Sequence, residues 1–82
     1  MRVKVEVFLK PGVLDVQGKA VEQALHGLGW DEVTEVRVGK TVEFDLAGTG
    51  DAAAAETEAR AMCERLLANT VIESYRVSAG GG

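Results

Sequence analysis

Two side chains of this sequence are of a type that does chemistry, the single His26 and the single Cys63. Zinc needs three or four protein ligands, and neither residue has a second His or Cys near it. Cys63 stands beside Met62 and Leu66 on an apolar helical stripe, which disfavours the reactive thiolate. The sequence therefore predicts a structural cysteine, a partly exposed histidine and no metal site.

The tripeptide Gly39-Lys40-Thr41 imitates the end of a phosphate-binding loop. That loop also needs a Gly five positions earlier, where this sequence has Thr34, and a helix directly afterwards, where an alternating strand follows. The acidic residues are scattered along the chain, without a close pair that would raise one carboxyl pKa for acid catalysis. We expect no catalytic residues in this chain.

The composition sets further limits. The chain has 82 residues, 46% of them hydrophobic, and a net charge of −4. This predicts one small domain and argues against nucleic acid, whose binding requires a positive patch. A single cysteine excludes an internal disulfide framework. No apolar run approaches the ~18 residues of a membrane span, and no signal peptide is visible, so we expect a cytoplasmic protein without membrane contact.

Hydrophobic periodicity predicts the elements on either side of the middle of the chain. Residues 2–9 alternate as a half-buried strand, and a helix follows over 16–28 with Asp15 as its N-cap. A second helix spans 52–68 with Asp51 as its N-cap, and a final strand covers 71–77. Trp30, after the first helix, is either the edge of the core or an interface anchor.

Residues 34–46 carry the most information. The apolar side chains from Val36 to Leu46 share one parity straight through Gly39. A two-residue hairpin would scramble that face, whereas a three-residue loop over 39–41 or one long strand bent at Gly39 would preserve it. We favour the long bent strand. About 13 residues exceed the usual strand of ~5–6, so this strand would overhang a monomer and require a partner.

The expected fold class is α+β, in the order β-α-β(long, bent)-α-β, with an antiparallel sheet and both helices on one face. One domain covers residues 1–78, as two α/β halves hinged near residue 39, and 79–82 form a flexible tail. The corner after the first strand carries Val13 and Leu14, which either staple the helix start or face another chain.

Three segments together resemble the PurS subunit of phosphoribosylformylglycinamidine (FGAM) synthase: LKPGVLDVQGKAV at 9–21, VRVGK at 36–40 and MCERLLAN at 62–69. The first is the most specific. Members of that family commonly have Pro where this chain has Val16 and Thr70. Both positions lie at helix edges, so the differences alter local rigidity only.

The resemblance implies a non-catalytic subunit of an ATP-dependent ligase of purine biosynthesis, with glutamine as the amido donor. Such a chain is a homodimer, with the tetramer left open, that pairs or exchanges its long strands. It bridges a PurQ-type glutaminase and a PurL-type synthetase, so that ammonia passes between them to convert formylglycinamide ribonucleotide to the amidine. ATP and magnesium belong to the synthetase partner, and this chain binds no cofactor.

The resemblance also places partner contacts in its first two segments, at Lys10, Pro11, Gly12, Asp15, Gln17, Gly18, Arg37, Gly39 and Lys40. The fold-level pattern alone also allows another class of protein, a stand-alone dimeric module of ferredoxin-like or ACT-like build. That alternative predicts saturable binding of a small effector by the isolated chain, whereas the bridging subunit predicts none.

Overall fold

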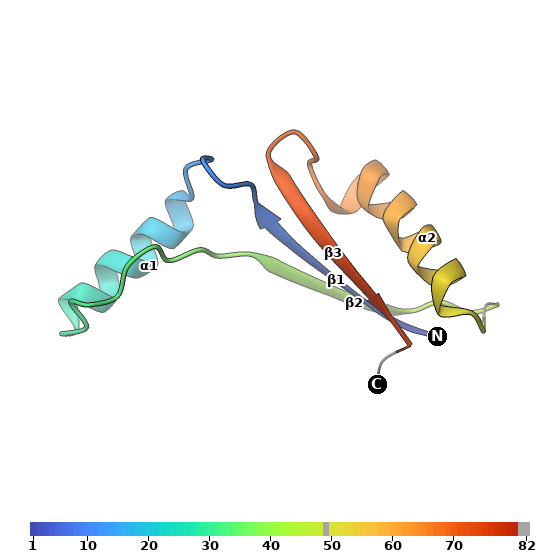
Figure 1. Ribbon diagram of the computed structural model, residues 1–82. Coiled ribbons are helices and arrows are strands. Elements are labelled where there is room, and N and C mark those ends of the chain that lie inside the picture. Colours follow the sequence, from blue (N-terminus) through green and yellow to red (C-terminus); the bar gives the residue numbers. More distant parts are fainter. Residues whose placement is uncertain (49, 81–82) are drawn as a thin grey trace.

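The computed structural model describes residues 1–48 and 50–80. Its strands and helices follow the predicted β-α-β-α-β order, as Figure 1 shows. They are β1 (Arg2–Leu9), α1 (Val16–Gly27), β2 (Lys40–Asp45), α2 (Ala52–Met62) with a π-helical turn η1 (Cys63–Leu67), and β3 (Glu73–Ala79).

β1 is the central strand of an antiparallel sheet with the order β2-β1-β3. Val5, for example, lies between Val42 of β2 and Val77 of β3. The alternation of β1 places Val3, Val5 and Val7 on one face, where each is 2% exposed or less. The opposite face carries Arg2, Lys4 and other polar side chains, because successive residues of a strand point to opposite faces.

Helix α2 covers the apolar face of the sheet. Ala55, Ala59 and Cys63 are fully buried in one core cluster with the valines of β1. The Asp51 side chain caps the helix by accepting a hydrogen bond from the Ala53 N–H. η1 carries the helical segment to Leu67, close to the predicted end at 68. Two small side chains facing β1 let α2 approach the sheet closely, which suits a core of this size.

Helix α1 does not lie on the sheet, so the prediction that both helices cover one face is wrong for α1. It projects beyond the end of β1 as an arm, with the chain of 33–39 running beside it (Figure 1). The molecule is consequently long and flat, 49 × 28 × 14 Å. Its radius of gyration is 15.9 Å, against about 12 Å for a compact chain of this length.

Only part of the predicted long second strand forms a paired strand in this structure. β2 covers 40–45, and residues 33–39 pair with no strand among the described residues. The three-residue hairpin over 39–41 is not formed, because β2 runs through Lys40 and Thr41 along β1. Residues 36–39 continue the line of β2 instead (Figure 1). Glu35 has a φ of 55°, and this left-handed residue separates that line from the preceding turn.

β3 begins and ends two residues later than the predicted strand. Asn69 organises the turn before β3: its side chain accepts a hydrogen bond from the Val71 N–H, and its carbonyl accepts from the Ile72 and Glu73 N–H groups. Ala79 pairs with Val3, and the Gly80 N–H bonds the Arg2 carbonyl. The boundary predicted at residue 78 therefore falls inside the sheet; 81–82 lie outside the described residues.

Candidate assembly interface

The Asp15 carboxylate joins α1 to the chain that enters β2. One oxygen accepts a hydrogen bond from the Gly18 N–H at 2.7 Å and so caps the helix, as predicted. The other oxygen accepts from the Val38 N–H at 2.8 Å. Asp15 is 6% exposed, the only buried charged side chain in the described part of the chain. A buried carboxylate needs such donors, and here they come from two segments far apart in sequence.

These hydrogen bonds lower the pKa of Asp15 below its usual value. The Val38 N–H is the largest cause, followed by the Gly18 N–H, and the positive charge of Arg37 acts in the same direction. Donors to a carboxylate favour its ionised form over the protonated one. Asp15 is therefore held as a carboxylate by its structural role, which is the opposite of what an acid catalyst requires.

Two glycines allow close approach of the backbone at this junction. A Cβ on Gly18 would collide with the Val36 carbonyl oxygen and with the Asp15 side chain. A Cβ on Gly39 would lie 2.6 Å from the Val7 carbonyl oxygen. Real Cβ atoms do not come this close to oxygen, so α1 and the end of β1 can contact the 36–39 segment only because both positions are glycine.

The predicted contact residues before the helix form a tight turn. Gly12 has a φ of 88°, which favours glycine after Pro11. The Arg37 guanidinium donates to the Val13 carbonyl at 3.2 Å and to the Lys10 carbonyl at 3.3 Å. The Lys10 ammonium donates to the Thr70 carbonyl at 2.8 Å. The turn is thus tied on one side to the 36–39 segment and on the other to the chain that enters β3.

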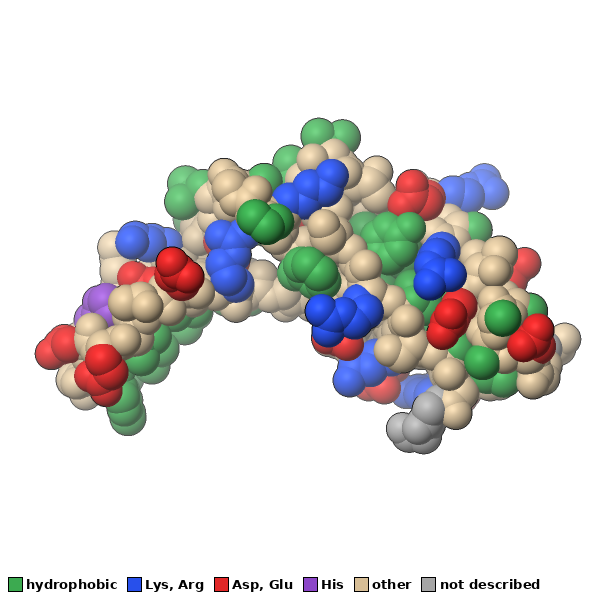
Figure 2. All heavy atoms as spheres, viewed as in Figure 1, with side chains coloured by type: hydrophobic (Ala, Val, Ile, Leu, Met, Phe, Trp, Pro, Cys, Tyr) green, Lys and Arg blue, Asp and Glu red, His purple; other side chains and the backbone are tan. Residues whose placement is uncertain are grey.

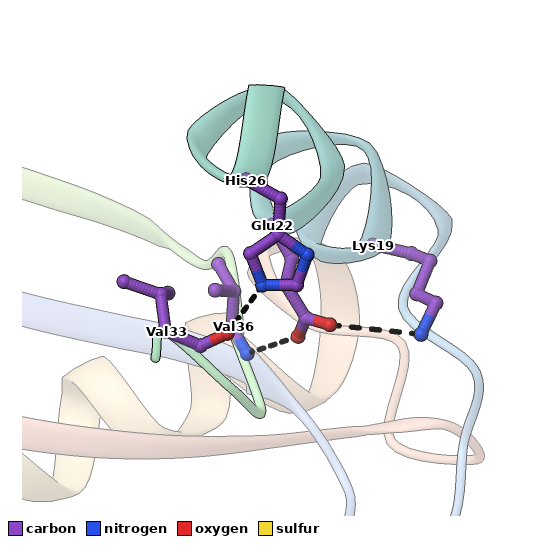
Figure 3. Close-up of polar contacts among 5 residues, drawn as sticks. All are labelled: Lys19, Glu22, His26, Val33 and Val36. Atoms are coloured by element: carbon purple, nitrogen blue, oxygen red, sulfur yellow. Dashed lines mark hydrogen bonds and ion pairs between the residues drawn. The ribbon is translucent and has the colours of Figure 1, made fainter. Parts of the chain in front are cut away.

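A second set of side chains on α1 holds the neighbouring segment, and sequence reasoning missed it. Glu22 accepts a hydrogen bond from the Val36 N–H at 3.3 Å, and the His26 ring contacts the Val33 carbonyl oxygen at 2.7 Å (Figure 3). Lys19 lies 3.7 Å from Glu22 in an ion pair. The Val36 N–H, followed by the charge of Lys19, lowers the pKa of Glu22.

The sequence did contain a signal for this set. Lys19, Glu22 and His26 are spaced three and four residues apart, so they share one helical face. His26 considered alone suggested only a partly exposed side chain. It is half-buried, as predicted, but its ring contacts a backbone group of the adjoining segment.

An open groove of about 820 Å³ lies between the arm and the end of β1. Pro11, Gly12, Asp15 and Arg37 line it, together with Lys19 and Glu22. Gln17, Gly39 and Lys40 line a smaller hollow of about 360 Å³ beside it. Most of the predicted contact residues therefore line these two hollows. Gly18 contributes its N–H to Asp15, and Lys10 contributes its ammonium to the Thr70 carbonyl.

The arm exposes apolar side chains that a monomer leaves uncovered. Leu14 and Leu28 are 74% and 72% exposed, and Trp30 is 52% exposed. Figure 2 shows hydrophobic side chains gathered along the lower side of the arm. The apolar stripe predicted for this helix is present, but α1 has no sheet beneath it. Exposed apolar patches of this kind mark protein interaction surfaces.

Within the described residues the geometry offers structural contacts rather than a reactive centre. No three His, Cys, Asp or Glu side chains gather at one point in residues 1–48 and 50–80. Burial raises the pKa of Cys63, which disfavours its thiolate. No helix in this part of the chain is long and apolar enough to cross a membrane. Fold and site together define a small α+β chain built around a junction and an uncovered arm.

Comparison with known proteins identifies the family. The family model described as PurS, phosphoribosylformylglycinamidine (FGAM) synthase, matches residues 2–80. The FGAM synthase subunit PurS of Bacillus subtilis is 48% identical over 75 residues, covering 92% of this chain and 87% of that protein. The corresponding subunit of Synechocystis is 46% identical, covering 88% of this chain and 71% of that protein. The chain belongs to the PurS family of FGAM synthase subunits, which serve purine biosynthesis.

Solved structures agree with this assignment. The fold is similar to that of Bacillus subtilis PurS, with a TM-score of 0.81, 47% identity and coverage of 94% of each chain. It is also similar to a chain in the structure of PurLQS from Thermotoga maritima, with a TM-score of 0.81 and 26% identity. That alignment covers 93% of this chain and 92% of the other.

Proposed function

We propose that this chain is a homodimeric bridge between a PurL-type synthetase subunit and a PurQ-type glutaminase subunit. The bridge holds the two so that ammonia released from glutamine is used to convert formylglycinamide ribonucleotide to the amidine. ATP and magnesium are bound by the synthetase partner, this chain binds no cofactor, and the complex works in the cytoplasm. The similar chain in the Thermotoga maritima PurLQS structure supports assembly with two such partners.

The observation that carries the proposal is the arm. α1 and residues 33–39 stand away from the sheet, with Leu14, Leu28 and Trp30 largely exposed. The N–H groups of Val36 and Val38 donate to the Glu22 and Asp15 carboxylates, which take the place of a neighbouring strand. These side chains hold the extended segment along one edge only. A small chain of this shape gains buried surface by association, because its own core contains few large side chains.

Bridging has a physical consequence for ammonia transfer. Two subunits held by a common third chain meet at an effective concentration set by geometry rather than by dilution. Ammonia then crosses a short enclosed distance instead of bulk solvent, so less of it is lost by diffusion or by protonation to ammonium. The bridge therefore contributes to the rate without supplying any reactive group.

The first experiment measures amidine formation by purified synthetase and glutaminase subunits, with and without this chain, using either glutamine or ammonium as donor. We expect glutamine-dependent formation to require the chain and ammonium-dependent formation to proceed without it. A Gly27→Ala variant added in place of the chain should support the same rate, because a Cβ at Gly27 meets nothing within 4 Å. Equal glutamine-dependent rates without the chain would contradict the bridge and return attention to a module that binds a small effector.

A further inference from the structure

The free end of the arm is a tight, hydrogen-bonded turn. The Trp30 N–H donates to a carbonyl of the last turn of α1 at 3.0 Å, and the Val33 N–H donates to the Trp30 carbonyl at 3.3 Å. The His26 ring contacts the Val33 carbonyl oxygen at 2.7 Å. Gly29, with a φ of 106°, permits the reversal of the chain. Residues 28–35, the arm tip, are therefore positioned by contacts within the arm itself.

The arm tip presents an apolar anchor that its own chain does not cover. Leu28 and Trp30 are both exposed, and among the described residues neither packs against the core cluster. The tip lies at the end of the arm farthest from the sheet (Figure 1). A tryptophan on a preformed turn provides a large contact area at a low cost in conformational entropy, which is typical of an interface anchor.

The charged side chains around this anchor have one sign. Asp31, Glu32 and Glu35 belong to the arm tip, which contains no Lys or Arg. All three are exposed. Figure 2 shows Asp and Glu side chains at the free end of the arm, next to the hydrophobic side chains of its lower side. Charge complementarity therefore favours an apolar pocket bordered by Lys or Arg as the surface that receives Trp30.

The groove of a second copy does not complement the arm tip. That groove, beside the end of β1, is lined by Lys19 and Arg37, but also by Asp15, Glu22 and Glu35. Acidic side chains of the groove would face the acidic side chains of an incoming tip. Like charges placed together across an interface disfavour association. The tip therefore fits a protein other than this chain.

We propose that the arm tip inserts Trp30 into an apolar pocket bordered by Lys or Arg on an enzyme subunit of the complex. The acidic side chains of the tip pair with that border, and Leu28 packs at the rim of the pocket. The proposal rests on the bridge put forward above and identifies one of its anchor points by the chemistry of the surface that it contacts.

The single tryptophan of the sequence makes a direct test possible. The full chain, produced with 5-fluorotryptophan at position 30, gives one fluorine resonance, to which unlabelled subunits do not contribute. It is titrated with the synthetase subunit, with the glutaminase subunit and with both. We expect at least one of these additions to shift the resonance and to reduce its solvent isotope effect, because the ring becomes buried. An unchanged resonance in all three titrations would overturn the proposal.

The charges of the tip are tested on unlabelled chain with the subunit that shifts the resonance. Glu32→Gln is expected to weaken binding about threefold at low salt, and Glu32→Lys about tenfold or more. Glu58→Gln, which removes the same charge from the exposed side of α2, is the matched control and should bind as the unsubstituted chain does. Binding should weaken between about 50 and about 300 mM salt, because salt screens exposed charges.

The possible failures are distinguishable. Equal affinities of Glu32→Lys and Glu58→Gln, or binding that salt does not weaken, would overturn the basic border of the pocket. A fluorine resonance that depends on the concentration of the chain alone would place Trp30 between two copies and overturn the proposal. Glutamine-dependent amidine formation that still requires the chain would leave the bridge standing in either case, whereas loss of that requirement would overturn the bridge itself.

Discussion

The Asp15 carboxylate and the Val38 N–H, 2.8 Å apart, join the first helix to the approach of the second strand. The same carboxylate caps α1, so one buried charge determines both where the helix starts and where the extended segment lies. Removing it leaves the Val38 N–H without its acceptor and the helix without its cap. The arm therefore depends on this residue more than on hydrophobic packing.

Acid should loosen the arm through this contact. The folded-state pKa of Asp15 is lowered, so its contribution to stability is full above its unfolded pKa, about 4, and is lost as pH falls through the folded value. Glu22 acts in the same direction. We expect the stability of wild-type chain to fall below about pH 4 and Asp15→Asn to reduce that dependence. Thermal unfolding between pH 2 and 7 measures it.

Asp31→Asn is the matched control for that experiment, since it removes the same charge from an exposed turn. Identical pH dependence in Asp15→Asn and wild type would show that the buried contact does not contribute. Amide exchange of Val38 in the same samples separates loss of the arm from loss of the whole fold.

Gly39→Val should impair assembly. The new side chain would begin 2.6 Å from the Val7 carbonyl oxygen, so the 36–39 segment must move away from the end of β1. We expect dimer affinity to fall by about tenfold or more, equivalent to about 1.4 kcal/mol, with a parallel loss of glutamine-dependent activity. Sedimentation equilibrium measures the affinity. Normal dimerisation and activity in this variant, compared with Gly27→Ala, would show that the close approach of residue 39 to the Val7 carbonyl does not need glycine.

Cys63 should react as a buried structural side chain. It is fully buried under the sheet, and burial raises its pKa. We expect a thiol reagent to label it only as fast as the chain unfolds. Cys63→Ser should cost about 1–3 kcal/mol because its hydroxyl would lack a partner, and Cys63→Ala about 1 kcal/mol. Denaturant unfolding measures both. Rapid labelling of folded chain would contradict the assignment of Cys63 to the core.

Trp30 provides a test of the arm as a contact surface. It is 52% exposed, which favours an interface anchor over the edge of the core. Trp30→Ala should change the free energy of unfolding by no more than about 0.5 kcal/mol while weakening assembly by roughly tenfold. Titration of the variant against the partner subunits measures the second effect. A large loss of stability with normal assembly would assign Trp30 to the core instead.

The sequence predicted the elements well where one face of an element is buried. β1 and α2 match because Val3, Val5, Val7 and Ala59 produce strong periodicity and all meet in one core. Asp15 and Asp51 were recognisable as caps because helix starts leave N–H groups that need an acceptor. The element order and the antiparallel sheet follow from these signals.

The arm could not be predicted in the same way. The apolar stripe of α1 suggested packing on the sheet, but periodicity identifies an apolar face without identifying what covers it. The parity of 34–46 correctly excluded a two-residue hairpin, yet the backbone groups of Val36 and Val38 bond carboxylates rather than a strand. The spacing of Lys19, Glu22 and His26 places them on one helical face, but it does not say which backbone groups they bond. The contacts of Glu22 and Asp15 with this segment were therefore not predicted.

The arm and the sheet share few buried apolar contacts, and this affects how the chain unfolds locally. Among the described residues, the core cluster contains none from α1, so we expect the arm to lose its structure while the sheet keeps its own. Local opening costs less free energy where fewer apolar groups are buried. We therefore expect the arm to open as a separate cooperative unit. A partner that binds only the arm should slow amide exchange in the arm and leave exchange in the sheet unchanged.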